Sequence, residues 1–197
     1  MPYIIRPRGI RSIAATLLGT ALLVGAAPAA AGAAECPSSP VSEALAQFGD
    51  SNLYSLLSGS SFESSTQGWS LSNAQVVSGG ALGSARSLLI SNGGSAVSPT
   101  ICVSNEEPSF RFFARQAGGM HSPLNVSLRW TERGFTHSTT VGSVYSGGNW
   151  TLSPAMELAT ALPLADSSGT LKVNIVFQPS WGSAWEIDDV YIDPYSR

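Results

Sequence analysis

Two adjacent acidic residues near the end of the sequence interrupt a strand-like pattern. In "AWEIDDVYID", apolar residues alternate up to Ile187 and again from Val190, but Asp188 and Asp189 separate the two runs. A β-bulge absorbs one extra residue in a strand and re-aims the side chains around it. We therefore expect a bulge whose two carboxylates point away from the core, where their repulsion requires a cation or hydrogen-bond donors.

A third acid, Glu63, lies in a similar setting near the start of the same region, in "SGSSFESSTQGWS", after Phe62, which we expect to be buried. A hard cation such as calcium takes about six to eight oxygen ligands from carboxylates, backbone carbonyls and water. Glu63 with Asp188 and Asp189 would supply the carboxylates, and turn carbonyls would complete the site. The alternative is that the aspartates are surface residues, hydrogen-bonded to backbone amides at a strand end.

Catalytic patterns are weak in this sequence. It contains no Gly-x-Ser-x-Gly motif, and a serine triad needs a histidine held by an acid. His121 lies in a "GGMHSP" turn and His137 in a polar hairpin, so we expect both to face solvent. Glu132, Glu157 and Glu186 have no predicted reason to converge as a glycosidase pair. We predict that the protein is not an enzyme.

Most of the secondary structure around these residues is expected to be β-strand. Apolar and polar residues alternate with period two in "SFRFFARQ", in "LNVSLRW" and in "LKVNIVF", which is typical of antiparallel strands with one face in a core. Turns rich in Gly, Ser and Asn separate them from shorter candidates that begin at Ser87, Pro99 and Met156. About eight to ten such strands predict an all-β fold, a two-sheet antiparallel β-sandwich.

The N-terminus is expected to be removed. Arg6, Arg8 and Arg11 form a basic head, an apolar run follows, and a tract of small residues ends at Ala34. This order is typical of a secretory signal peptide over residues 1–34. We therefore predict a secreted, extracellular protein.

Residues 35–57 form an N-terminal segment with one short helix, and residues 58–197 form the sandwich domain. The helix is predicted over "SPVSEALAQFGD", which Gly49 can end. Its apolar face consists of Val41, Ala44, Leu45 and Phe48.

The mature chain is acidic and contains two cysteines. Without the three signal-peptide arginines, seven basic residues face thirteen acids, a net charge of −6. This balance makes nucleic acid an improbable partner, and after signal cleavage we expect no stable membrane insertion. In an exported protein, Cys36 and Cys102 most simply form one disulfide, which would contribute roughly 4 kcal/mol.

The segments "SGSSFE…GW" and "WEIDDVYID" resemble the galactose-binding-like jelly rolls, which include many secreted bacterial carbohydrate-binding modules. The resemblance covers about residues 58–193. It implies a jelly-roll sandwich with a structural calcium ion near the paired terminal strands, held by Glu63 and by Asp188 or Asp189. The sequence departs from the family pattern at "GSS" before Phe62, which puts backbone ligands from that turn in doubt.

The resemblance also implies a glycan-binding surface of exposed aromatic rings with nearby arginines. The candidates are Phe113, Arg111, Arg115, Trp181 and Tyr145. The alternative for Phe113 is that it packs under a covering loop or under the N-terminal helix. We expect a secreted, non-catalytic binding module for carbohydrate; the rival is a structural or adhesive cell-surface protein that makes protein–protein contacts.

Overall fold

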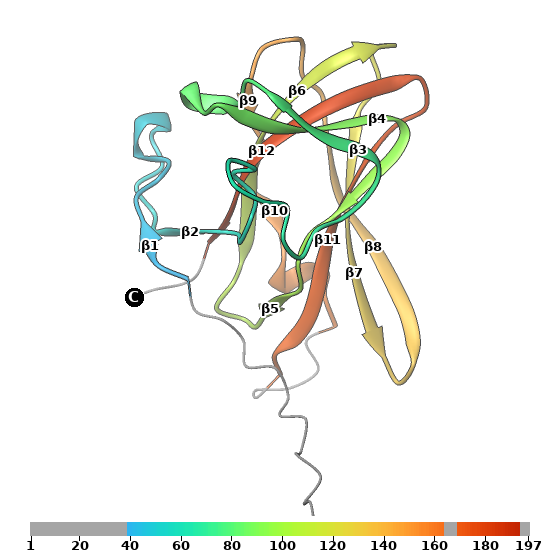
Figure 1. Ribbon diagram of the computed structural model, residues 1–197. Coiled ribbons are helices and arrows are strands. Elements are labelled where there is room, and N and C mark those ends of the chain that lie inside the picture. The colour runs from blue at the N-terminus through green and yellow to red at the C-terminus, as the bar shows by residue number, and fades with distance from the viewer. Residues whose placement is uncertain (1–38, 164–168, 194–197) are drawn as a thin grey trace, which may run out of the picture. The chain divides into compact units, whose positions relative to one another are not determined.

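Strands make up most of the chain in the computed structural model, which describes residues 39–163 and 169–193 (Figure 1). All of these residues belong to one compact unit. The strands are β1 (Val41–Ser42), β2 (Tyr54–Leu56), β3 (Ser70–Ser78), β4 (Arg86–Val97), β5 (Ile101–Val103), β6 (Ser109–Gly119), β7 (Leu124–Glu132), β8 (Phe135–Val144), β9 (Thr151–Leu152), β10 (Met156–Glu157), β11 (Leu171–Pro179) and β12 (Ser183–Asp193). Short 3-10 helices are η1 (Ala46–Phe48), η2 (Ala81–Gly83) and η3 (Ala159–Ala161). The predicted signal peptide, residues 1–34, lies outside the described residues and stays a prediction.

Two antiparallel layers form the sandwich. In sheet one, β12 pairs with β6 and with β4 and β2. In sheet two, β11 pairs with β7 and with β5, and β8 continues the sheet beyond β7. The β3–β4 hairpin joins the layers, because Leu88 and Ile90 of β4 lie beside β12 whereas Ala96 and Val97 pair with β11. The predicted two-sheet antiparallel sandwich is confirmed.

Alternating side chains of both sheets fill the space between them. On β7 every second residue from Leu124 to Trp130 is buried, and on β11 the same holds from Val173 to Phe177. Phe112 of β6 meets Phe177 edge-on, with ring centroids 4.9 Å apart, which is a favourable arrangement for aromatic pairs. The period-two pattern therefore places the main core as expected.

The N-terminal helix is much shorter than predicted. Val41 and Ser42 form β1, which pairs with β2, and only η1 is helical before Gly49 ends it with φ of 80°. Short isolated helices are marginal in water, and pairing with β2 satisfies backbone groups that a helix would otherwise have to satisfy. Of the four residues on the predicted helical face, only Leu45 is fully buried.

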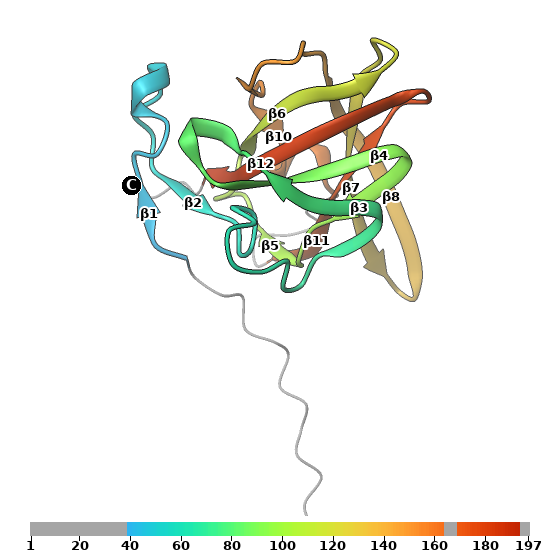
Figure 2. The same ribbon diagram turned by 45° about the horizontal axis from the view of Figure 1, so that its top comes forward.

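The N-terminal segment covers the outer face of sheet one. Leu45 and Tyr54 pack there with Ala81 of η2 and Phe113 of β6, in a second, smaller hydrophobic cluster. Figures 1 and 2 both place β1 and the blue segment that follows it on the opposite side of the domain from the β7–β8 hairpin. The outer face of sheet two is thus not covered by this segment.

Candidate functional site

The adjacent acids lie at a β-bulge in β12, as the broken alternation predicts. Asp188 pairs with Phe113 of β6. Tyr191, three residues further on, pairs with Arg111, only two residues back along β6. The extra residue of β12 lies between these two pairs, where Asp189 has a φ of 43°. This is a left-handed conformation that non-glycine residues adopt infrequently.

Asp188 points away from the main core, as expected, but it is fully buried, because the loop around η2 covers it. Its Oδ2 accepts hydrogen bonds from the Ala81 N–H at 2.8 Å and the Ser84 hydroxyl at 2.6 Å, and its Oδ1 accepts one from the Asp189 N–H at 3.0 Å. The loop around η2 closes over it so tightly that a Cβ at Gly80 would lie 2.5 Å from Oδ2. Burial, helped by the charge of Asp189, raises the pKa of Asp188 to about 7.

The other two predicted calcium ligands lie nearer the surface. Glu63 is exposed and its Oε1 accepts a hydrogen bond from the Arg86 N–H at 3.0 Å. Burial, and then the charge of Glu63, raise the pKa of Asp189. Within residues 39–163 and 169–193, no three acidic, His or Cys side chains form a group that could hold a metal ion. Asp188 is hydrogen-bonded to backbone amides, as the alternative expects, although it is buried and not at the surface. The calcium site stays a prediction.

Three of the five predicted ligand residues lie on the covered face of sheet one. Phe113 is only 2% exposed, and its ring centroid is 5.4 Å from that of Phe48. Arg111 donates to Asp50 of the covering segment at 2.9 Å. The prediction that Phe113 belongs to an accessible ligand surface is therefore wrong, and the alternative, packing under the N-terminal segment, is what the structure shows.

Arg115, the third of these residues, belongs to a half-buried polar cluster. Its Nε and one terminal nitrogen donate to Glu186 Oε2 at 2.9 and 2.7 Å. The Ser87 hydroxyl donates to the same oxygen at 3.1 Å. The guanidinium also lies 4.9 Å from the ring centroid of Trp150, within the range of a cation–π contact. The Arg115 guanidinium thus already has two partners within the protein, the Glu186 carboxylate and the Trp150 ring.

Trp181 and Tyr145, the remaining two, are open to solvent at 79% and 67% exposure. Trp181 lies in the turn between β11 and β12, and Tyr145 directly follows β8. The Ser180 N–H donates to the Pro123 carbonyl oxygen, just before β7, at 2.8 Å. Because β7 lies between β11 and β8, both rings belong to the same end of sheet two.

A row of polar side chains that the sequence analysis did not single out crosses sheet two at this end. Gln178 of β11, Asn125 of β7 and Ser143 of β8 are register neighbours on its outer face. Asn125 donates to the Ser180 hydroxyl and accepts from the Ser143 hydroxyl, each at 2.9 Å. The outward positions of the alternating strands were the signal that could have identified them. Ser180, to which Asn125 donates, directly precedes Trp181 in the chain. The row of polar side chains therefore lies next to this tryptophan.

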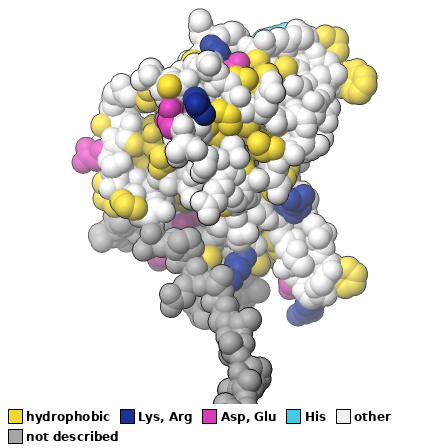
Figure 3. Space-filling model, in the orientation of Figure 1, with side chains coloured by type: hydrophobic (Ala, Val, Ile, Leu, Met, Phe, Trp, Pro, Cys, Tyr) yellow, Lys and Arg dark blue, Asp and Glu magenta, His cyan; other side chains and the backbone are white. Residues whose placement is uncertain are grey.

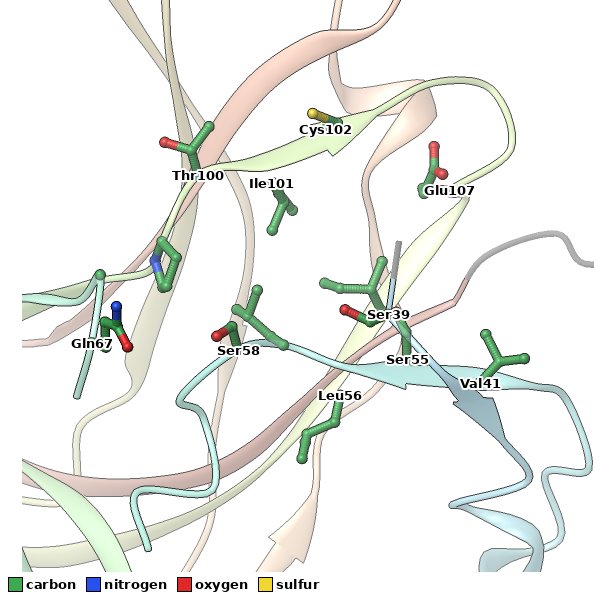
Figure 4. A pocket seen from close by; sticks show the side chains of 14 residues that line it. Ser39, Val41, Ser55, Leu56, Ser58, Gln67, Thr100, Ile101, Cys102 and Glu107 are labelled. Carbon is green, nitrogen blue, oxygen red and sulfur yellow. The ribbon is translucent and has the colours of Figure 1, made fainter. Parts of the chain in front are cut away.

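A cavity of about 640 Å³ lies at one side of the sandwich, between β2 and β5 (Figure 4). Hydroxyl-bearing and apolar residues line it, among them Ser39, Leu56, Thr100 and Cys102. None of the five predicted ligand residues does. Cys36 lies outside the described residues, so its disulfide with Cys102 stays a prediction; Ser39, three residues further on, lines the same cavity as Cys102.

Charged side chains are sparse on the surface. Figure 3 shows those of one face as isolated spots and not as a continuous patch. In the described part of the chain, no helix has the length and apolar character needed to cross a bilayer.

Comparison with known proteins identifies the fold. No family model and no curated protein matches the sequence. The CBM22-1 xylan-binding domain of Paenibacillus barcinonensis Xyn10C is 15% identical with a TM-score of 0.52, over 70% of this chain and 92% of that one. The CBM22-1–GH10 modules of Clostridium thermocellum endo-1,4-beta-D-xylanase 10B, complexed with xylohexaose, are 15% identical with a TM-score of 0.51, over 68% of this chain and 28% of that one. The CBM22-1–CBM22-2 tandem domain of the Paenibacillus protein is 15% identical with a TM-score of 0.50, over 68% of this chain and 44% of that one.

These matches span less than a third of the xylanase chain, most of the isolated domain and under half of the tandem domain. At this identity a structural likeness establishes the fold and not the ligand. The chain therefore has the jelly-roll fold of these carbohydrate-binding modules.

Proposed function

We propose that the protein is a non-catalytic glycan-binding module whose ligand lies on the outer face of sheet two, at the end marked by Trp181 and Tyr145. The observation that carries this proposal is the hydrogen-bonded row of Asn125, Ser143 and Ser180 beside the exposed Trp181. Tyr and Trp are enriched at binding interfaces, because each combines a large apolar ring with one polar group.

The chemistry of this end suits sugars. A sugar ring presents C–H groups on its faces and hydroxyls around its edge. The rings of Trp181 and Tyr145 can pack against the faces. Amides and hydroxyls such as those of Gln178, Asn125 and Ser143 can exchange hydrogen bonds with the edge, since each group both donates and accepts. Such a site has few charges and needs no catalytic residue.

The structural neighbours support the same class of ligand. One of them is a xylan-binding domain and another is in a complex with xylohexaose. Export through the signal peptide expected over residues 1–34 is part of the proposal, because it would bring the domain to glycans outside the cell.

A calcium ion at the β12 bulge is a further part of the proposal. Its support is the row of acids at the bulge: besides burial, the charge of Asp189 raises the pKa of Asp188, and the charge of Glu63 raises the pKa of Asp189. A cation there would join the two ends of the domain and would stabilise the fold without touching the glycan.

Affinity electrophoresis in gels containing xylan, galactan, mixed-linkage glucan or cellulose derivatives tests the proposal. We expect retardation of the protein in at least one gel, and Trp181→Ala and Tyr145→Ala should each reduce it about ten-fold or more. Phe135→Ala is the matched control, because Phe135 is 71% exposed but lies at the opposite end of β8.

Two outcomes would contradict the proposal. Equal loss in Phe135→Ala and Trp181→Ala would mean that exposed apolar area, and not this site, retains the protein. Migration unaffected by every glycan would favour the rival, a structural or adhesive protein whose sandwich contacts another protein.

A further inference from the structure

We propose that Arg129 makes sheet two a receptor for acidic glycans, binding a carboxylate carried by the sugar chain. This inference rests on the proposed function and names its ligand class. Arg129 lies near the middle of the outer face of sheet two, half-buried among uncharged neighbours.

The strand register fixes those neighbours. Arg129 of β7 lies opposite Asn174 of β11 on one side and Ser138 of β8 on the other. The next row towards Trp181 contains Ser127, and the row after that contains Asn125. Four residues of an extended strand span about 13 Å. The guanidinium and the aromatic end are thus parts of one continuous surface.

Within the described residues, Arg129 makes no ion pair and no hydrogen bond through its side chain, whereas Arg111 and Arg115 are both paired. Its surroundings explain the difference, because no carboxylate among residues 39–163 and 169–193 lies on the same face. The outward positions of β7, β8 and β11 are Asn125, Ser127, Arg129, Thr131, Thr136, Ser138, Thr140, Ser143, Lys172, Asn174, Val176 and Gln178. Two of them are basic and none is acidic.

The charge of this face is opposite in sign to that of the whole protein, in which thirteen acids outnumber ten basic residues. The acids of β12 gather on the sheet-one side instead: Glu186 lies beside Arg115, and Asp188 lies under η2. A half-buried arginine without a carboxylate partner, on a surface of hydroxyls and amides, is complementary to an anion that arrives with the ligand.

A carboxylate fits this guanidinium better than a point charge would, since its two oxygens can accept two parallel N–H donors. Asn174 and Ser138 are the register neighbours of Arg129. The Asn174 amide N–H groups donate to the Ser98 carbonyl oxygen and the Thr100 hydroxyl, so the Asn174 carbonyl oxygen and the Ser138 hydroxyl are the groups that can bind neighbouring sugar hydroxyls. Because Arg129 lies about 13 Å from the Asn125 row, only an oligosaccharide of several units reaches both. Affinity for the acidic ligand should therefore rise with chain length.

Binding to polygalacturonate, to its carboxyl-reduced neutral form and to dextran sulfate tests the proposal, by affinity electrophoresis and calorimetry at low and moderate salt. We expect the unaltered protein to prefer polygalacturonate over both other polymers. Arg129→Gln should weaken polygalacturonate binding about ten-fold and leave binding to the reduced polymer unchanged. Arg133→Gln is the control, because Arg133 lies at the tip of the same hairpin with its side chain 89% exposed, and it should change neither.

Each of the following results would contradict one claim of this proposal. Equal binding to the acidic and the reduced polymer, both lost in Trp181→Ala, would refute the role of Arg129 and leave the proposed function intact. Equal loss in the Arg129 and Arg133 variants would show unspecific attraction between charges. Stronger binding to dextran sulfate would refute the preference for carboxylate. Failure of all three polymers to bind would refute this inference, and only failure of the neutral glycan gels as well would refute the proposed function. Equal melting temperatures of the variants would confirm that the fold is unchanged.

Discussion

Replacing Phe113 by Ala separates the two roles that the sequence allows for this residue. In the structure its ring is 2% exposed and lies in the cluster with Leu45, Tyr54 and Ala81, beneath Phe48. Truncation of a buried Phe to Ala costs about 3–5 kcal/mol, and less where the surroundings can collapse into the space.

Phe48 is 45% exposed and can move inward, so we expect the lower end of that range for Phe113→Ala, about 3 kcal/mol. In a domain of this size, such a loss lowers the melting temperature by about 6–12 °C. Urea unfolding followed by tryptophan fluorescence, with a thermal scan as a second probe, measures the free energy of unfolding. Glycan retention is measured on the same samples below the transition.

Phe48→Ala is the control, since it removes the covering ring and leaves Phe113 in place. It should cost about 1 kcal/mol or less, and neither substitution should weaken glycan binding. The reasoning would be refuted if Phe113→Ala kept its stability and lost its ligand. In that case the N-terminal segment would not cover β6, and Phe113 would be the exposed ligand residue that the sequence pattern also permits.

Three other predictions concern the β12 bulge. Because the pKa of Asp188 in the folded protein, about 7, lies above its ordinary value near 4, the folded state holds a proton that the unfolded state has released. The free energy of unfolding should therefore fall by roughly 4 kcal/mol at most between about pH 4 and pH 7, and this slope should flatten in Asp188→Asn; identical pH profiles of the two proteins would contradict it. Gly80→Ala should destabilise the protein by more than about 2 kcal/mol, because its Cβ would meet Ser84 Oγ, the Arg86 carbonyl oxygen and Asp188 Oδ2 at 2.5 Å or less. Gly118→Ala, with nothing within 4 Å, is the control in the same unfolding assay, and equal stabilities would show that the loop is looser than described. If the bulge binds calcium, millimolar calcium should raise the melting temperature by several degrees relative to chelator, an effect lost in Glu63→Ala; the same scan with and without metal would refute the site if no difference appears.

The strands, the two-sheet sandwich and the bulge could all be predicted from the sequence pattern. Strand alternation is a local property, because successive side chains point to opposite faces whatever lies above them. The two residues between Ile187 and Val190 therefore predict the register shift that β12 makes against β6. The exposure of Trp181 and Tyr145 was also foreseeable, since both lie in or next to turns rich in Gly and Ser.

Which polar face stays accessible could not be predicted from the sequence, because it depends on the packing of distant segments. The pattern that places Arg111, Phe113 and Arg115 on one side of β6 is the same kind of pattern that places Asn125 and Arg129 on one side of β7. The first face is covered by a segment about sixty residues away in the chain, through contacts such as that between Phe48 and Phe113, whereas no segment that the structure describes covers the second. Such contacts depend on how distant segments pack, because alternation specifies that a side chain faces outward and not what lies against it.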